Sequence, residues 1–146
     1  MRTRPDTYFL TTVIVERRVL LQSDANASLL SRLTFQYRDE GRYFLHAFVV
    51  MPDHLHALLT PSYDQSIDRC MQCIKGGFSN ALGNDSRHAK RIWQPGFRQQ
   101  RVRDAEDYLR RRSYIAQNPD DWGLRAYPHV HFSGPALDPM PRHLRA

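Results

Sequence analysis

The chain has 146 residues, 41% of them apolar and 25% charged, a composition typical of one soluble domain with a single hydrophobic core. Lysine and arginine outnumber aspartate and glutamate by 21 to 15, so polyanionic partners are favoured. Apolar stretches fall short of the ~20 residues that span a bilayer, and the first residues do not resemble a signal peptide. We therefore expect a cytoplasmic protein without a membrane partner.

The first predicted elements are a strand and a helix. Residues 8–15 are rich in β-branched and aromatic side chains, which is typical of a strand. Either Ser23 or Asp24 can cap a helix that follows, and Gly41 marks its end.

The next segment predicts a β-hairpin whose returning strand carries two histidines. Residues 43–51 are nearly all apolar, a tight turn or bulge follows, and residues 54–60 form the second strand of the hairpin. Residues two apart on a strand point to the same face, so His54 and His56 present two imidazoles side by side. Two imidazoles on a rigid strand are half of a divalent-metal site, although His-x-His also arises by chance on surface strands.

A second helix and a fourth strand follow the hairpin. Ser66 begins the helix, whose apolar residues follow the 3.6-residue period up to Gly83. Cys70 and Cys73, the only cysteines in the sequence, lack the second pair that a zinc ribbon needs, so we expect reduced thiols, with Cys70 in the core. Residues 92–102 predict the fourth strand.

The remaining segment predicts a third helix and a tail. Asp104 caps this helix, and we expect it to stop at Asn118, because a residue before proline is disfavoured in helical geometry. The first six elements form the split β-α-β ferredoxin-like arrangement, an α+β fold with a four-stranded antiparallel sheet and helices on one face. The third helix is an addition. We expect one domain over residues 1–134 and a loosely ordered tail over residues 135–146, which hold three prolines and little apolar content.

One face of the third helix carries groups suited to phosphoryl transfer. Tyr114 and Asn118 are four residues apart and share this face, and Arg110 and Arg111 flank it. The opposite side carries residues at core-like spacing: Tyr108, Leu109, Ile115 and Ala116. A tyrosine hydroxyl, with an ordinary pKa near 10, is a poor nucleophile at neutral pH, but neighbouring arginines lower such a pKa and a metal makes a phosphate more electrophilic. Two histidines, an amide oxygen and a tyrosine are therefore a complete set for covalent phosphotyrosine chemistry, provided that the two segments meet.

Four stretches of the chain occur in the order of a known family pattern: residues 49–56 (Val-Val-Met-Pro-Asp-His-Leu-His), 74–75 (Ile-Lys), 93–97 (Trp-Gln-Pro-Gly-Phe), and 114–119 (Tyr-Ile-Ala-Gln-Asn-Pro) followed by 123–124 (Gly-Leu). In these stretches the chain resembles the single-tyrosine HUH transposases, named for His-hydrophobic-His, and in particular their REP-associated tyrosine transposase branch. The resemblance covers about residues 8 to 125. It departs from the pattern at Gln99 and Gln100, where many relatives carry an acidic residue and a histidine.

The resemblance implies a ferredoxin-like fold and a specific site. It implies Tyr114 as the nucleophile and His54, His56 and Asn118 as ligands of Mg²⁺ or Mn²⁺. The implied activity is a metal-dependent single-stranded DNA endonuclease and strand transferase that cuts at repeated extragenic palindromic (REP) hairpins through a 5′-phosphotyrosine. The partner would be single-stranded or hairpin DNA, with no small-molecule cofactor, and a monomer is favoured while a dimer stays open. The candidate DNA-binding residues are Lys75, Arg98, Arg101, Arg103, Arg110 and Arg111.

Two other functions remain open at this stage. One is a catalytically idle hairpin-binding protein on the same fold, in which the arginines supply affinity alone. The other is a metallohydrolase without a tyrosine intermediate, using His129 and His131 together with the first histidine pair. This second pair lies in a weakly patterned segment in which no strand is predicted.

Overall fold

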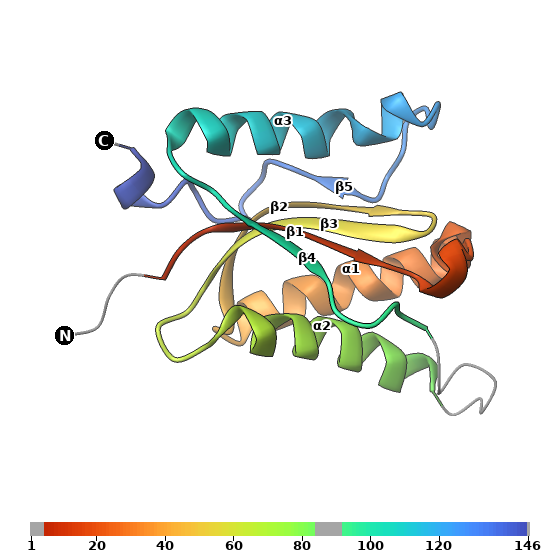
Figure 1. The fold of residues 1–146 in the computed structure, drawn as a ribbon. Coiled ribbons are helices and arrows are strands. Elements are labelled where there is room, and N and C mark those ends of the chain that lie inside the picture. The colour runs from red at the N-terminus through yellow and green to blue at the C-terminus, as the bar shows by residue number, and fades with distance from the viewer. Residues whose placement is uncertain (1–4, 84–91, 146) are drawn as a thin grey trace.

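The polypeptide folds into one antiparallel sheet that is covered by helices on both faces (Figure 1). The computed structural model describes residues 5–83 and 92–145. The main elements along the chain are β1 (Tyr8–Val13), α1 (Asp24–Asp39), β2 (Tyr43–Met51), β3 (His54–Pro61), α2 (Ile67–Leu82), β4 (Arg98–Arg101), α3 (Ala105–Asp121) and β5 (Val130–His131). Short 3₁₀ turns lie at Val15–Arg17, Leu20–Gln22 and Arg142–Leu144. The strand order is β4-β1-β3-β2-β5, with every neighbouring pair antiparallel.

The sheet separates two hydrophobic clusters. Helices α1 and α2 cover one face and α3 crosses the other (Figure 1). Residues of the central strands point alternately to the two faces, so β2 and β3 are buried on both sides. The larger cluster, beneath α1 and α2, includes Leu10, Leu30, Leu45, Phe48, Leu55, Ile74 and Phe78. The smaller cluster, beneath α3, includes Phe9, Val49, Met51, Leu58, Tyr108 and Ile115.

The predicted ferredoxin-like α+β fold is confirmed, and the helix starts follow the predicted caps. The side chains of Ser23, Ser66 and Asp104 each accept a hydrogen bond from the backbone N–H three residues later. Gly41, with φ of 83°, ends α1 in the left-handed region that glycine adopts without strain. Cys70 is a buried free thiol in the core, as predicted.

The sheet has five strands rather than the predicted four. The additional strand, β5, pairs with β2 through Phe48 with His131 and Val49 with Val130. It covers what would otherwise be an open edge beside a nearly all-apolar strand. A two-residue strand is too short to leave a period in the sequence, which explains why the prediction missed it.

Two element boundaries and the burial of one residue also differ from the prediction. The fourth strand is limited to Arg98–Arg101, because the chain bends at Gly96 (φ 73°) and Trp93 makes only an isolated bridge to Ile14. Helix α3 continues through Pro119 to Asp121. Pro119 lacks the N–H that would donate one backbone hydrogen bond within the helix. The N–H of Trp122 still closes the last turn by donating to the carbonyls of residues 118 and 119. Leu109, expected in the core, is exposed because α3 turns it away from the sheet.

The C-terminal segment packs against the sheet, whereas composition predicted a loosely ordered tail. The carboxylate of Asp138 accepts hydrogen bonds from the guanidinium of Arg38 (2.9 and 3.2 Å) and from the N–H of Leu45 (2.8 Å). The backbone N–H of Asp138 donates to the carbonyl of Leu45. Further along the segment, Leu144 is buried in the cluster beneath α3. One carboxylate and one leucine therefore anchor a segment that is otherwise rich in proline.

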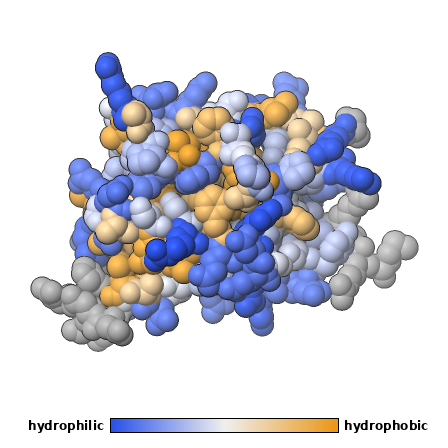
Figure 2. All heavy atoms as spheres, turned by 180° about the vertical axis from the view of Figure 1, so that it is seen from behind, coloured by the Kyte–Doolittle hydropathy of each residue, from blue (hydrophilic) through white to orange (hydrophobic). Residues whose placement is uncertain are grey.

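None of the helices in residues 5–83 and 92–145 is both long and apolar enough to cross a bilayer. Seen from behind, apolar residues lie in separate patches among charged ones (Figure 2).

Candidate active site

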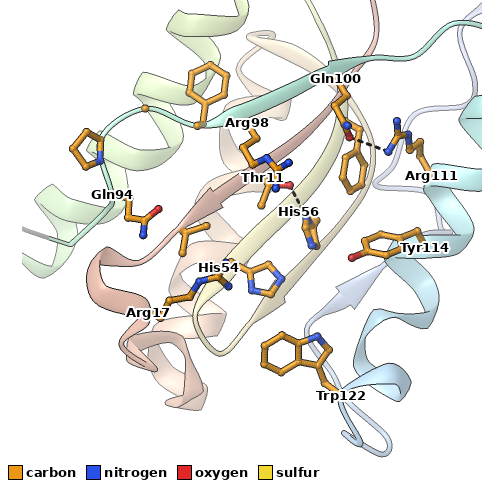
Figure 3. A pocket seen from close by; sticks show the side chains of 15 residues that line it. Thr11, Arg17, His54, His56, Gln94, Arg98, Gln100, Arg111, Tyr114 and Trp122 are labelled. Carbon is orange, nitrogen blue, oxygen red and sulfur yellow. Dashed lines mark hydrogen bonds between the residues drawn. The ribbon is translucent and has the colours of Figure 1, made fainter.

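The two strand histidines lie side by side on the α3 face of β3. Their ring centroids are 4.5 Å apart, and both side chains are largely buried. The carboxylate of Asp53 accepts from Nδ1 of His54 (2.6 Å), and Nδ1 of His56 is hydrogen-bonded to the hydroxyl of Thr11 (2.9 Å) (Figure 3). Because both Nδ1 atoms are engaged, each ring has its Nε2 available to a metal, an arrangement common among metal-binding histidines.

The electrostatic surroundings keep His56 neutral. Burial, followed by the neighbouring His54, lowers the pKa of His56 to about 3. A neutral imidazole is the form that binds metal.

Helix α3 places Tyr114 over this pair. The Tyr114 ring meets the His56 ring edge to face at 5.4 Å and the Phe9 ring at 5.8 Å. Its hydroxyl is directed toward the histidines, and the side chain is 46% exposed (Figure 3). Strand β3 and helix α3 therefore meet at the site, a contact that residue spacing alone does not predict.

Asn118 lies one helical turn beyond Tyr114 on the same face, with Trp122 a further turn along. Tyr114 packs on His56, whereas Trp122 packs on His54 at 5.6 Å, so Asn118 is placed between them. Asn118 is only 2% exposed, and its Oδ1 has no hydrogen-bond partner among the described residues. A buried carbonyl oxygen without a partner is uncommon and fits a cation ligand.

The donor set of the site therefore fits Mg²⁺ or Mn²⁺. Within residues 5–83 and 92–145, no three side chains of the His, Cys, Asp or Glu type converge on one point. The candidate ligands are two imidazole nitrogens and one amide oxygen, which leave further positions for phosphate oxygens or water.

His54, His56 and Tyr114 border a cavity of about 570 Å³ whose lining includes three arginines. Arg98 of β4 and Arg111 of α3 line one side, and Arg17 lines another (Figure 3). The Arg111 guanidinium lies 5.1 Å from the centroid of the Phe9 ring and donates to Oε1 of Gln100 at 2.9 Å. Gln100, at the departure from the family pattern, thus orients a cavity arginine.

The other candidate DNA-binding residues lie elsewhere. Arg101 alternates with Gln100 on β4 and points to the opposite face of the sheet. Arg103 and Arg110 both contact the buried carboxylate of Asp107. The Lys75 ammonium donates to the carbonyls of Gln94 (3.1 Å) and Gly96 (2.7 Å), so it fixes the Trp-Gln-Pro-Gly-Phe loop at the mouth of the cavity.

Several residues of the site are not predicted from the sequence, among them Asp53, Arg17 and Trp122. The position of Asp53 directly before His54 is a usable signal. Arg17, in the left-handed region at φ 55°, places its guanidinium 3.4 Å from Asp53, and nothing in the local pattern predicts it. Trp122 follows the predicted end of the helix and was overlooked for that reason.

The second histidine pair lies on the opposite face of the sheet. His131 stacks on Phe48 with centroids 4.6 Å apart, and His129 is hydrogen-bonded to Asp24 of α1 at 2.6 Å. Phe48 belongs to the cluster beneath α1 and α2, whereas His54 and His56 face α3. A site that combines all four histidines is therefore not formed, which removes the metallohydrolase interpretation in that form.

The fold is similar to those of two solved structures. A REP-associated tyrosine transposase solved with a bound REP hairpin superposes with a TM-score of 0.73 at 24% identity, covering 94% of this chain and 91% of that one. A candidate transposase from Deinococcus radiodurans R1 superposes with a TM-score of 0.58 at 21% identity, covering 79% and 92%.

The sequence identifies the family. The family model described as "Transposase IS200 like" matches residues 7–118, and the chain belongs to this family. The REP-associated tyrosine transposase of Escherichia coli K12 is 30% identical over 114 residues. That alignment covers 77% of this chain and 66% of the relative, so the chain spans slightly less than two thirds of the relative's length.

Proposed function

We propose that the protein is a metal-dependent single-stranded DNA endonuclease and strand transferase that acts at REP hairpins through Tyr114. The position of Tyr114, edge to face with His56 in an arginine-lined cavity, is the observation that carries the proposal. The named activity of the E. coli relative and the REP hairpin bound to the structural neighbour support the choice of substrate.

The chemistry follows from the groups in the cavity. The DNA strand binds with a phosphate beside Arg98 and Arg111, whose guanidinium groups suit phosphate oxygens. The Tyr114 oxygen attacks phosphorus and loses its proton, the bond from phosphorus to the 3′ oxygen breaks, and the departing oxygen takes up a proton to become a 3′-hydroxyl. A divalent ion held by His54, His56 and Asn118 would supply stabilisation of charge on the non-bridging oxygens.

The supporting residues hold this arrangement in place. Asp53 holds the proton on Nδ1 of His54, so that Nε2 faces the cavity, and Thr11 orients His56. Every candidate ligand and the nucleophile come from one chain, so a monomer is sufficient for the reaction.

The direct test is covalent capture. A labelled single-stranded REP hairpin is incubated with protein and Mn²⁺ and resolved on a denaturing gel. The wild type should form a DNA–protein adduct that Tyr114→Phe lacks. The matched control is Tyr63→Phe, which removes a hydroxyl from another exposed tyrosine, in the loop after β3 and outside this cavity. Hairpin binding without any adduct would favour the catalytically idle alternative.

A further inference from the structure

Trp122 is a large exposed aromatic side chain beside the candidate metal site. It is the C-cap residue of α3, and its ring lies 5.6 Å from the His54 ring at a tilt of 52°. The side chain is 51% exposed and lines the cavity (Figure 3). Much of its apolar surface therefore stays in contact with solvent, which is unfavourable unless a ligand covers it.

Hydrogen bonds fix the backbone around Trp122. Its N–H donates to the carbonyls of Asn118 (3.3 Å) and Pro119 (3.1 Å), and Gly123 follows with φ of 74°. The N–H of Leu124 also returns to the carbonyl of Pro119 at 2.8 Å. These bonds preorganise the indole at the cavity mouth, so little conformational freedom is lost when a ligand binds there.

The surroundings of Trp122 select for a nucleotide. Arg17, Arg98 and Arg111 line the same cavity, and none of its described lining residues is acidic. Such a lining attracts a polyanion, while an exposed indole offers a flat face on which a base can stack. The arginines therefore match the phosphates of a DNA single strand, and the indole matches one of its bases.

We propose that Trp122 stacks on a base of the single strand adjacent to the phosphate that Tyr114 attacks. The inference rests on the proposed function, since it places single-stranded DNA in this cavity. Trp122 thereby makes the site prefer a strand with a base at that position. The indole holds the strand from the His54 side, while Tyr114 approaches from the His56 side.

The first test compares two DNA ligands in the Tyr114→Phe background, which prevents cleavage. One is a hairpin with short thymidine tails, and the other has the same tails made abasic, with all phosphates retained. The thymidine tails should bind about 5- to 150-fold more tightly, the range for stacking one base on an aromatic side chain. Trp122→Leu should bring this ratio close to one, whereas Trp122→Phe should retain part of it. Tyr63→Leu, which removes an exposed aromatic outside this cavity, should leave the ratio unchanged.

The second test reads the contact directly by fluorescence. The chain has two tryptophans, and Trp93 is held by its indole N–H on the carbonyl of Lys75 (3.1 Å). In Trp93→Phe, the emission of Trp122 should be quenched by thymidine tails and unaffected by abasic tails. In Trp122→Phe, the emission of Trp93 should remain constant with both. An unchanged binding ratio in Trp122→Leu, or a constant Trp122 emission on saturation with thymidine tails, would overturn the proposal.

This result is separable from the covalent reaction. Both measurements are made in the Tyr114→Phe background, which cannot form an adduct, so a negative outcome here leaves the nucleophile assignment to the gel experiment. Conversely, failure of the wild type to form an adduct would remove the proposed reaction and leave the measured base preference standing.

Discussion

Tyr114 of α3 and His56 of β3 meet edge to face, with their ring centroids 5.4 Å apart. His56 in turn lies 4.5 Å from His54, centroid to centroid, so the tyrosine and the histidine pair form one contiguous group. The contact between Tyr114 and His56 is not local in sequence. It depends on α3 docking across the face of the sheet that α1 and α2 leave free.

Replacing either strand histidine should abolish most metal-dependent cleavage. His56→Ala removes one candidate ligand, and we expect adduct formation to fall by at least about tenfold, with partial recovery at high Mn²⁺. The matched control is His131→Ala, an imidazole on the opposite face of the sheet, which should keep cleavage activity. The reaction is run at a temperature below the melting temperatures of the wild type and of His56→Ala. The adduct yield is then measured on a denaturing gel. Equal yield from wild type and His56→Ala in metal-buffered solution would exclude this metal site.

Asn118→Ala should impair cleavage without destabilising the fold. The Oδ1 atom of Asn118 is buried without a hydrogen-bond partner among the described residues, so its removal relieves a desolvation cost and offsets the lost packing. We expect the melting temperature to change by only a few degrees and cleavage to recover partly as Mn²⁺ is raised. Asn118→Asp, which keeps an oxygen, should retain more activity than Asn118→Ala. A large fall in melting temperature with no metal rescue would make Asn118 a structural helix-end residue.

Hairpin binding should weaken steeply with salt, and the arginines of the cavity should account for part of the slope. Each phosphate neutralised on a single strand contributes about −0.7 to the slope of log K against log salt. Arg98→Ala should therefore make the slope shallower by about 0.7. Arg101→Ala, on the same strand but the opposite face, should change it less. Fluorescence anisotropy over a salt series measures both, and equal effects would indicate that DNA contacts both faces.

Stability of the metal-free protein should fall as the pH drops from about 6.5 toward 5. Burial lowers the pKa of His46, and likewise that of His56 and His131, below the ordinary value of 6.5. The unfolded chain therefore binds more protons in this range, and stability is retained above pH 6.5 and lost below it. Each fully buried histidine contributes at most about 1.4 kcal/mol per pH unit, and the partly buried His131 contributes less.

His46 offers a specific test of this dependence. Its Nδ1 donates to the carbonyl of Asp138 (3.1 Å), and its Nε2 accepts from the hydroxyl of Thr60 (2.8 Å), which protonation would prevent. His46→Gln should flatten the pH dependence of the melting temperature measured in EDTA. The same slope in wild type and His46→Gln would mean that His46 does not contribute.

The sequence by itself predicted most of the elements and the candidate reacting groups. The two-residue period of a strand puts His54 and His56 on one face, and the helical repeat puts Tyr114 and Asn118 on another. These relationships depend only on backbone geometry, and the predicted caps at Ser23, Ser66 and Asp104 were confirmed for the same reason.

Only the tertiary structure decided which side chains share a cavity. Lys75 and Arg101 carry the same charge as Arg98, yet one is bound to loop carbonyls and the other faces away from the site. Trp122 gained its position because α3 continues past Pro119, which local propensity opposed. Strand β5 likewise forms because its backbone pairs with the edge of β2. These features arise from contacts between segments far apart in sequence, where burial and hydrogen bonding outweigh local preference, so no short pattern in the chain records them.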